Sequence, residues 1–148
     1  MDFAFTEDQR NIREAVLRHC SQFSDDYWLE HDRSGEFPSD FHMSMAEAGW
    51  LGIAMPEAVG GSGLGITEAA VMMQAVAESG GGMTAASSVH GPVFGLEPVI
   101  LFGTEEQQRR YLPKLATGEW ISAFALTEPE AGSDAANVQS TATPTGDG

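Results

Sequence analysis

The start of the chain alternates apolar and charged positions with the period of an amphipathic helix. Apolar side chains return every three or four residues, at Ile12, Val16, Cys20 and Phe23. Thr6 and Gln9 precede most of this stripe with the spacing of a capping box, in which each side chain accepts the other's backbone N–H. The pattern predicts one long helix from about Glu7 to the late twenties, with a charged exposed face.

Four later helical stretches are predicted, over about residues 38–48, 67–78, 83–101 and 104–115. Gly49 stands where a helix-ending glycine belongs, and the triplet Gly80–Gly82 separates the second stretch from the third. Glycines inside the third stretch weaken its helical signal. Thr104 and Gln107 form a second capping box, and Pro113 is expected to start a fresh turn because it has no backbone N–H.

The pattern changes after Gly118. Residues 120–126 form a nearly continuous apolar run, and residues 138–143 alternate with a period of two, as a half-buried strand does. We therefore predict a mainly α chain with a domain boundary near Gly118. Residues 1–118 form a helical domain in this prediction, and residues 119–148 form the start of an incomplete β-domain.

The final residues, Asp147-Gly148, read as a hairpin turn signal. Two strands without further neighbours are rarely stable alone. The sequence therefore indicates either a piece of a longer protein or partner strands that come from another chain.

Composition limits the class of partner. Hydrophobic residues make up 42% of the 148 positions, enough to fill the core of one ordinary domain. Seven basic residues stand against 22 acidic ones, for a formal net charge of −15. This imbalance argues against nucleic acid and against anionic membrane surfaces as partners.

The cysteine and histidine content argues against disulfide and metal chemistry. Cys20 is the only cysteine, so no internal disulfide can form, and its place in the helical stripe predicts a buried thiol. The four histidines are His19, His31, His42 and His90, and their spacing is not typical of a metal site. The start has no signal-peptide pattern and no run approaches about 18 apolar residues, so we expect a cytoplasmic protein in a reducing compartment.

The run Phe124-Ala-Leu-Thr-Glu-Pro-Glu-Ala-Gly-Ser-Asp134 joins an apolar entry to a rigid turn rich in donors. Pro129 fixes its own φ and favours extended backbone before it, while Gly132 permits either positive φ or close approach of a ligand. Thr127 and Ser133 add hydroxyls at the two ends of the bend. The alternative is a hairpin or strand-to-loop turn in which these residues serve conformation alone.

Two glycine-containing segments are further candidate sites. Gly60–Gly65 lacks the third glycine of G-x-G-x-x-G and follows no clear strand, so a flexible turn explains it better than a dinucleotide loop. His90-Gly91-Pro92 interrupts a helical stretch and leaves room beside it. Either a pocket wall or a kinked core helix fits that second segment. Paired acids such as Glu105-Glu106 are expected to be solvated or to cap helix N-termini.

Residues 127–134 resemble the T-E-P-x-A-G-S-D flavin-binding signature of acyl-CoA dehydrogenases. Residues 56–64 match the P-E-x-x-G-G-x-G-L loop of that family's helical domain, and residues 49–53 and 103–113 add further similarity. The resemblance implies an N-terminal helical domain followed by the first strands of a middle β-barrel domain. The family's C-terminal four-helix bundle would lie outside this sequence.

The resemblance also implies a flavoprotein oxidoreductase acting on an acyl-CoA thioester. In α,β-desaturation a carboxylate removes an α-proton and FAD accepts a hydride. The residues implied to contact FAD are Phe124, Leu126, Thr127, Gly132 and Ser133. Ser133 would also reach the CoA part of the substrate, and Ser87, His90 and Phe94 would line the acyl pocket.

The family's catalytic glutamate belongs to the C-terminal domain, so no catalytic residue is assigned here and this chain alone is expected to be inactive. The resemblance implies an electron-transfer flavoprotein as partner and a homotetramer or dimer. CoA and FAD are anionic, so their phosphates would need helix N-termini, backbone amides or cations from elsewhere. Open alternatives are an acyl-CoA oxidase or flavin monooxygenase on the same fold, and a non-catalytic helical binding or assembly module.

Overall fold

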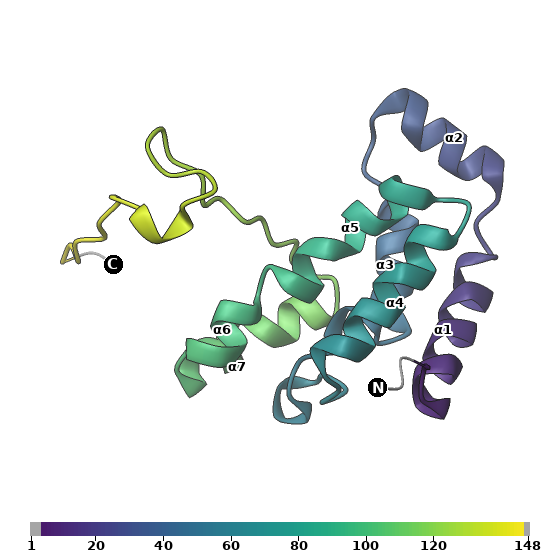
Figure 1. The fold of residues 1–148 in the computed structure, drawn as a ribbon, viewed down its shortest axis with the longest axis horizontal. Helices are drawn as coiled ribbons and strands as arrows, with labels where there is room; N and C mark the ends of the chain where they lie inside the picture. The colour runs from purple at the N-terminus through teal and green to yellow at the C-terminus, as the bar shows by residue number, and fades with distance from the viewer. Residues whose placement is uncertain (1–3, 147–148) are drawn as a thin grey trace.

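The computed structural model describes residues 4–146, which form a mainly helical protein (Figure 1). The helices within that range are α1 (Glu7–Cys20), α2 (Asp25–Ser34), α3 (Ser39–Glu47), α4 (Ile66–Glu78), α5 (Gly82–Phe94), α6 (Glu97–Phe102) and α7 (Glu105–Ala116), with short 3-10 helices at Trp50–Gly52, Glu57–Val59 and Ala135–Asn137. The mainly α fold class is confirmed. The hairpin signal at Asp147-Gly148 lies outside the described residues.

The first predicted helix is two helices. The Thr6–Gln9 capping box is present, and α1 ends at Cys20. The chain restarts at Ser24, whose hydroxyl accepts the backbone N–H of Tyr27 at 3.3 Å and caps α2. Because an N-cap serine followed by two acids is itself a helix-start signal, the break was readable from the sequence. Phe23, between the two helices, stacks edge-on against Phe41 of α3, with ring centroids 5.1 Å apart.

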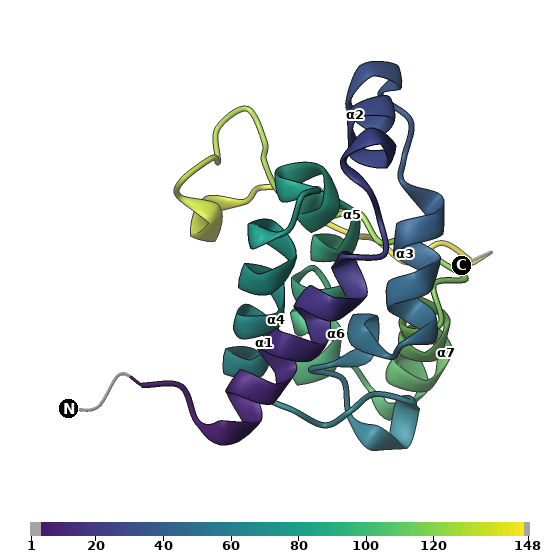
Figure 2. The same ribbon diagram turned by 90° about the vertical axis from the view of Figure 1, so that its right-hand side faces the viewer.

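The main core lies between α1, α3, α4 and α5. Figure 2 shows α1 and α4 side by side, and their facing side chains Val16, Met72 and Val76 are fully buried. Cys20 is 2% exposed, which confirms the predicted buried thiol. Leu112 centres a second, smaller cluster beneath α6 and α7.

The glycine-rich loop at residues 60–65 is fixed by hydrogen bonds and is not a free turn. Ser62 N–H donates to the Gly52 carbonyl at 3.0 Å, and Gly63 N–H donates to the Met55 carbonyl at 2.8 Å. A Cβ at Gly61 would lie 2.1 Å from the Met55 carbonyl oxygen, so glycine is required there by close approach.

The stretch predicted over 83–101 divides into α5 and α6 near Gly95. By length and composition alone, residues 82–102 taken together could cross a membrane. No run of apolar residues in the sequence approaches that length. Core helices of soluble proteins pass the same test, and α5 carries the fully buried Ala85 and Val89. Pro113 lies inside α7, so the predicted fresh turn there is wrong. The residue four positions before it, Arg109, is exposed, so water can serve the carbonyl that the proline leaves without its helical donor.

The strands predicted over 120–126 and 138–143 are wrong for the described residues, where the chain is extended or irregular without a β-ladder. The isolated bridge between Glu128 and Ala131 is the one β-type pairing described. An apolar or alternating run becomes a strand only when a neighbouring strand pairs with it, and none lies beside these residues. Figure 1 shows the segment leaving the helical body. The domain boundary near Gly118 stays a prediction.

Candidate functional site

One face of α5 borders a hollow that gathers four of the residues singled out from the sequence. Ser87, His90 and Phe94 follow one another at helical spacing, and Phe124 of the C-terminal segment closes the hollow from the other side. The hollow has a volume of about 630 Å³. Its remaining lining residues are Gly91, Gly95, Pro98 and Ser122.

A second hollow of about 540 Å³ lies on the other side of the same three side chains. It is lined mostly by apolar groups of α4 and α5, namely Met73, Gln74, Ala77, Met83 and Ala86 together with Ser87, His90 and Phe94. The His90 and Phe94 rings are 5.5 Å apart, so they form one aromatic ridge between the hollows. The arrangement suits an apolar group with a few polar contacts.

Gly91 allows the C-terminal segment to approach α5. A Cβ at position 91 would lie 2.7 Å from the Ser122 carbonyl oxygen and 3.1 Å from the Ser122 hydroxyl. The Ser122 hydroxyl is buried without a hydrogen-bond partner among the described residues. The sequence does not reveal Ser122, because its role depends on a contact with Gly91, 31 positions away. The room that Gly91 leaves beside the helix is the one signal that points to such a contact.

The turn after Thr127 is held by its own hydrogen bonds. Glu128 and Ala131 exchange backbone hydrogen bonds of 3.0 and 3.2 Å around the Pro129-Glu130 corner. The Glu128 carboxylate accepts the backbone N–H groups of Gln139 at 2.8 Å and Ser140 at 3.0 Å. Hydrogen bonds from Ser140 and Gln139 hold the pKa of the Glu128 carboxyl below its ordinary value. Glu128 therefore serves local structure, as a turn residue was expected to.

The remaining predicted flavin residues are exposed. Leu126 is 42% exposed, and neither it nor Thr127, Gly132 and Ser133 lines the two hollows beside α5. Of the two alternatives for Gly132, positive φ does not occur, which leaves close approach of a ligand. A Cβ there would meet nothing within 4 Å, so a ligand has open access to this part of the backbone.

These residues fit a flavin in their chemistry. A flavin ring needs hydrogen-bond partners at its edge and apolar contact on its face. The same stretch of sequence carries hydroxyls on the exposed residues Thr127 and Ser133 and the exposed apolar side chains Phe124 and Leu126. The unpartnered Ser122 hydroxyl adds a further polar group beside Phe124. Of the chain's seven basic residues, four form ion pairs with carboxylates, so few cations are left for phosphates.

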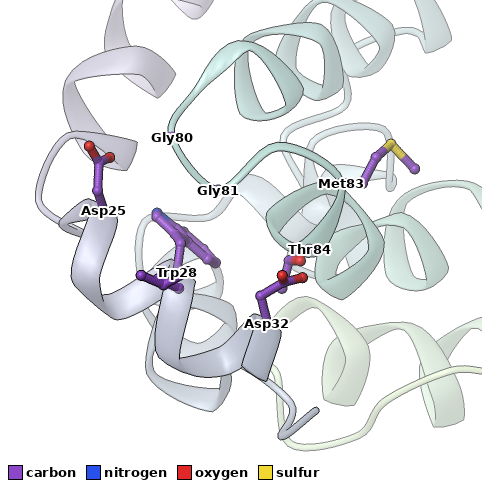
Figure 3. A pocket seen from close by; sticks show the side chains of 8 residues that line it. Asp25, Trp28, Asp32, Gly80, Gly81, Met83 and Thr84 are labelled. Carbon is purple, nitrogen blue, oxygen red and sulfur yellow. The ribbon is translucent and has the colours of Figure 1, made fainter. Parts of the chain in front are cut away.

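Another hollow, of about 460 Å³, lies between α2 and the turn before α5 (Figure 3). Trp28 lies close to this turn, since a Cβ at Gly81 would come within 2.5 Å of its indole ring. Asp25 and Asp32 stand at its margin (Figure 3). None of the residues predicted to bind FAD or substrate lines it. Among residues 4–146 no cluster of histidine, cysteine or acidic side chains could hold a metal ion.

The sequence matches a known protein family. The family described as "Acyl-CoA dehydrogenase, N-terminal domain" matches residues 6–119. The mitochondrial isobutyryl-CoA dehydrogenase of Dictyostelium discoideum is 37% identical over 142 residues, covering 96% of this chain and 34% of that protein. The chain thus spans about a third of the length of this relative.

Solved structures give the same result. A structure described as the electron-transferring flavoprotein of Acidaminococcus fermentans has a TM-score of 0.84 at 34% identity, over 99% of this chain and 38% of that one. PigA with FAD and proline has a TM-score of 0.83 at 30% identity, over 98% of this chain and 38% of that one. With the helical fold and the match over residues 6–119, these similarities show that the chain belongs to the acyl-CoA dehydrogenase family.

Proposed function

We propose that this chain supplies the helical part, and part of the FAD and substrate site, of an enzyme that desaturates an acyl-CoA thioester at its α,β bond. The observation that carries the proposal is the hollow beside α5. It brings the acyl-pocket residues Ser87, His90 and Phe94 together with Phe124, a residue assigned to the flavin. A substrate carbon and a flavin ring need such closeness to react.

The chain's own residues have distinct parts in this proposal. Phe124 and Leu126 would pack against the flavin ring, and Thr127 would donate a hydrogen bond to its edge. Gly132 would give close backbone access, and Ser133 would contact both FAD and the CoA part of the substrate. Ser87, His90 and Phe94 would border the acyl group. Bound FAD would supply the chemistry of accepting a hydride from the β-carbon.

Removal of the α-proton needs a positioned base, and we assign no such residue to this chain. An α-proton of a thioester is too weakly acidic to leave without a base and hydrogen bonds to the developing enolate. Glu128 is committed to the backbone N–H groups of Gln139 and Ser140. We therefore propose that residues 4–146 alone bind and orient without completing the reaction.

The proposed partners follow from the same reading. An electron-transfer flavoprotein as the electron acceptor is proposed from membership of the acyl-CoA dehydrogenase family. A homotetramer or dimer and a cytoplasmic location are further proposals. Nucleic acid remains disfavoured as a partner because the formal net charge is −15.

The first test uses the complete protein reconstituted with FAD. Flavin absorbance should appear, and it should bleach when isobutyryl-CoA or butyryl-CoA is added. Thr127→Val should weaken FAD binding about five- to tenfold, the size of one lost hydrogen bond. Thr67→Val, at an exposed threonine of α4, is the matched control and should leave FAD affinity unchanged. Absence of flavin absorbance and of bleaching would favour the non-catalytic binding module instead.

The second test separates the dehydrogenase from an oxidase or monooxygenase on the same fold. The reduced complete protein is mixed with air-saturated buffer in a stopped-flow instrument. Slow reoxidation agrees with a dehydrogenase that passes electrons to a protein partner. Fast reoxidation would overturn that choice in favour of oxygen chemistry.

A further inference from the structure

Helix α5 contains a proline in its interior, where a proline removes one helical hydrogen bond. Pro92 lies inside α5 and is buried. An α-helix joins each N–H to the carbonyl four residues earlier, and a proline has no N–H to give. The carbonyl that loses its helical donor here belongs to Ser88, which is itself only 4% exposed. A buried carbonyl without a partner is costly, because water cannot replace the missing donor.

His42 of α3 supplies a donor at this point. Its Nδ1 lies 2.8 Å from the Ser88 carbonyl oxygen, and the imidazole is 2% exposed. Since a carbonyl only accepts, Nδ1 must carry the hydrogen. The other ring nitrogen, Nε2, is buried without a partner among the described residues. Only Nδ1 of His42 therefore has a hydrogen-bond partner among the described residues, and that partner is the Ser88 carbonyl that Pro92 leaves without a helical donor.

We propose that His42 is a positioning residue that completes α5 across Pro92: its Nδ1–H replaces the helical hydrogen bond that the proline removes from the Ser88 carbonyl. The bond fixes the two turns of α5 that carry Ser87, His90 and Phe94. These side chains border the hollow, so His42 sets their spacing without touching it. This consequence for the acyl group rests on the proposed function, whereas the completion of α5 does not.

Pro113 in α7 provides an internal comparison. The carbonyl that loses its donor there belongs to Arg109, an exposed residue, and water can supply the hydrogen bond. No protein donor needs to be provided at such a position. Pro92 differs because both the proline and Ser88 are buried, and a donor must come from another element.

The test is a double-mutant cycle in the full chain, read by urea unfolding. His42→Leu should raise the unfolding equilibrium constant about tenfold or more, the cost of leaving a buried carbonyl unpaired. Pro92→Ala restores an N–H at position 92, so the Ser88 carbonyl regains its own helical donor. In that background His42→Leu should have a clearly smaller effect. Equal effects of His42→Leu in the two backgrounds would overturn the proposal.

Two further measurements do not depend on His42→Leu folding. His42→Asn keeps an N–H donor near the place of Nδ1 and should retain amide protection in α5 near that of the unchanged chain. In the unchanged chain, nitrogen NMR shifts should show hydrogen on Nδ1 of His42. Hydrogen on Nε2 instead would refute the assigned hydrogen bond. None of these readouts uses a ligand, so they can fail or succeed independently of flavin or acyl-CoA binding.

Discussion

The helical body, residues 7–116, and the C-terminal segment, residues 119–146, are held by different forces. The body has a core with fully buried side chains such as Phe41 and Leu51. In the described part of the C-terminal segment, Ala131 is the one residue that is buried as a whole, and the Ser122 hydroxyl is a buried atom of a partly exposed residue. The segment is fixed by the hydrogen bonds of one turn and by the Glu128 carboxylate. The candidate site lies where these two regions meet, so one of its walls belongs to the packed helical body and the other to an exposed strip of chain.

The same chemical change in the two regions should give the largest contrast. Phe41→Ala removes a fully buried ring that stacks with Phe23 and Trp28, and it should cost about 3–5 kcal/mol of unfolding free energy. Phe124→Ala removes a ring that is 63% exposed, and it should change stability by less than about 0.5 kcal/mol. Urea denaturation of both variants measures the difference. Similar costs would mean that the segment is as well packed as the body.

Glycine-to-alanine changes sharpen the comparison at the level of the backbone. The Cβ of Gly61→Ala would meet the Met55 carbonyl at 2.1 Å, so the loop must shift, at a cost of about 1–3 kcal/mol. Gly132→Ala meets nothing within 4 Å and needs no positive φ, so its stability should stay within about 0.5 kcal/mol. Thermal unfolding of the pair gives the readout. If Gly132→Ala lowered stability more than Gly61→Ala, the backbone at Gly132 would be packed against other residues, which contradicts the open space around it.

The sequence predicted the elements whose signals are local. The capping boxes at Thr6 and Thr104 both form as expected, because each depends on residues three positions apart. The start of α2 at Ser24 was equally local, but the continuing apolar stripe outweighed it. The expected fresh turn at Pro113 was wrong because the carbonyl that loses its helical donor belongs to the exposed Arg109, where water can replace that donor.

Long-range contacts explain what the sequence could not give. The meeting of Ser122 with Gly91, and of His42 with the Ser88 carbonyl, depends on how α3, α5 and the C-terminal segment pack. No periodicity reports such pairs. The two expected strands failed for the same reason, since an extended run becomes a strand only through a partner that the run itself does not encode. Ser87, His90 and Phe94, which we propose to border the acyl group, were assigned by resemblance alone, and the structure places all three beside one hollow.

A helix cap in the body should give an intermediate effect. The Thr104 hydroxyl accepts the Gln107 N–H at 3.2 Å, and the Gln107 side chain accepts the Thr104 N–H at 2.8 Å. Thr104→Ala should cost about 1 kcal/mol by urea denaturation, because α7 loses a partner for an N-terminal N–H. Thr104→Ser keeps the hydroxyl and is the control. A loss as large for serine as for alanine would show that the methyl group, rather than the cap, matters.

The smallest effect is expected at Glu128 and should be confined to the C-terminal segment. Folding holds the pKa of this carboxyl below its ordinary value of 4.5, through hydrogen bonds from Ser140 and Gln139. The ionised carboxylate therefore favours the folded turn at neutral pH. That contribution begins to fade as the pH falls below 4.5 and is lost as the pH passes through the lower folded pKa.

The backbone amide protons of Gln139 and Ser140 report this titration directly, because both donate to the Glu128 carboxylate. Their NMR shifts should move together with a midpoint below 4.5, while amides of the helical body such as that of Leu112 should not follow. Glu128→Gln should abolish the shared titration, and Glu130→Gln is the matched control that should leave it. A midpoint at or above 4.5 would contradict the hydrogen bonds that join the Glu128 carboxylate to Gln139 and Ser140. The C-terminal segment would then lack the interaction that holds its turn to residues 139–140.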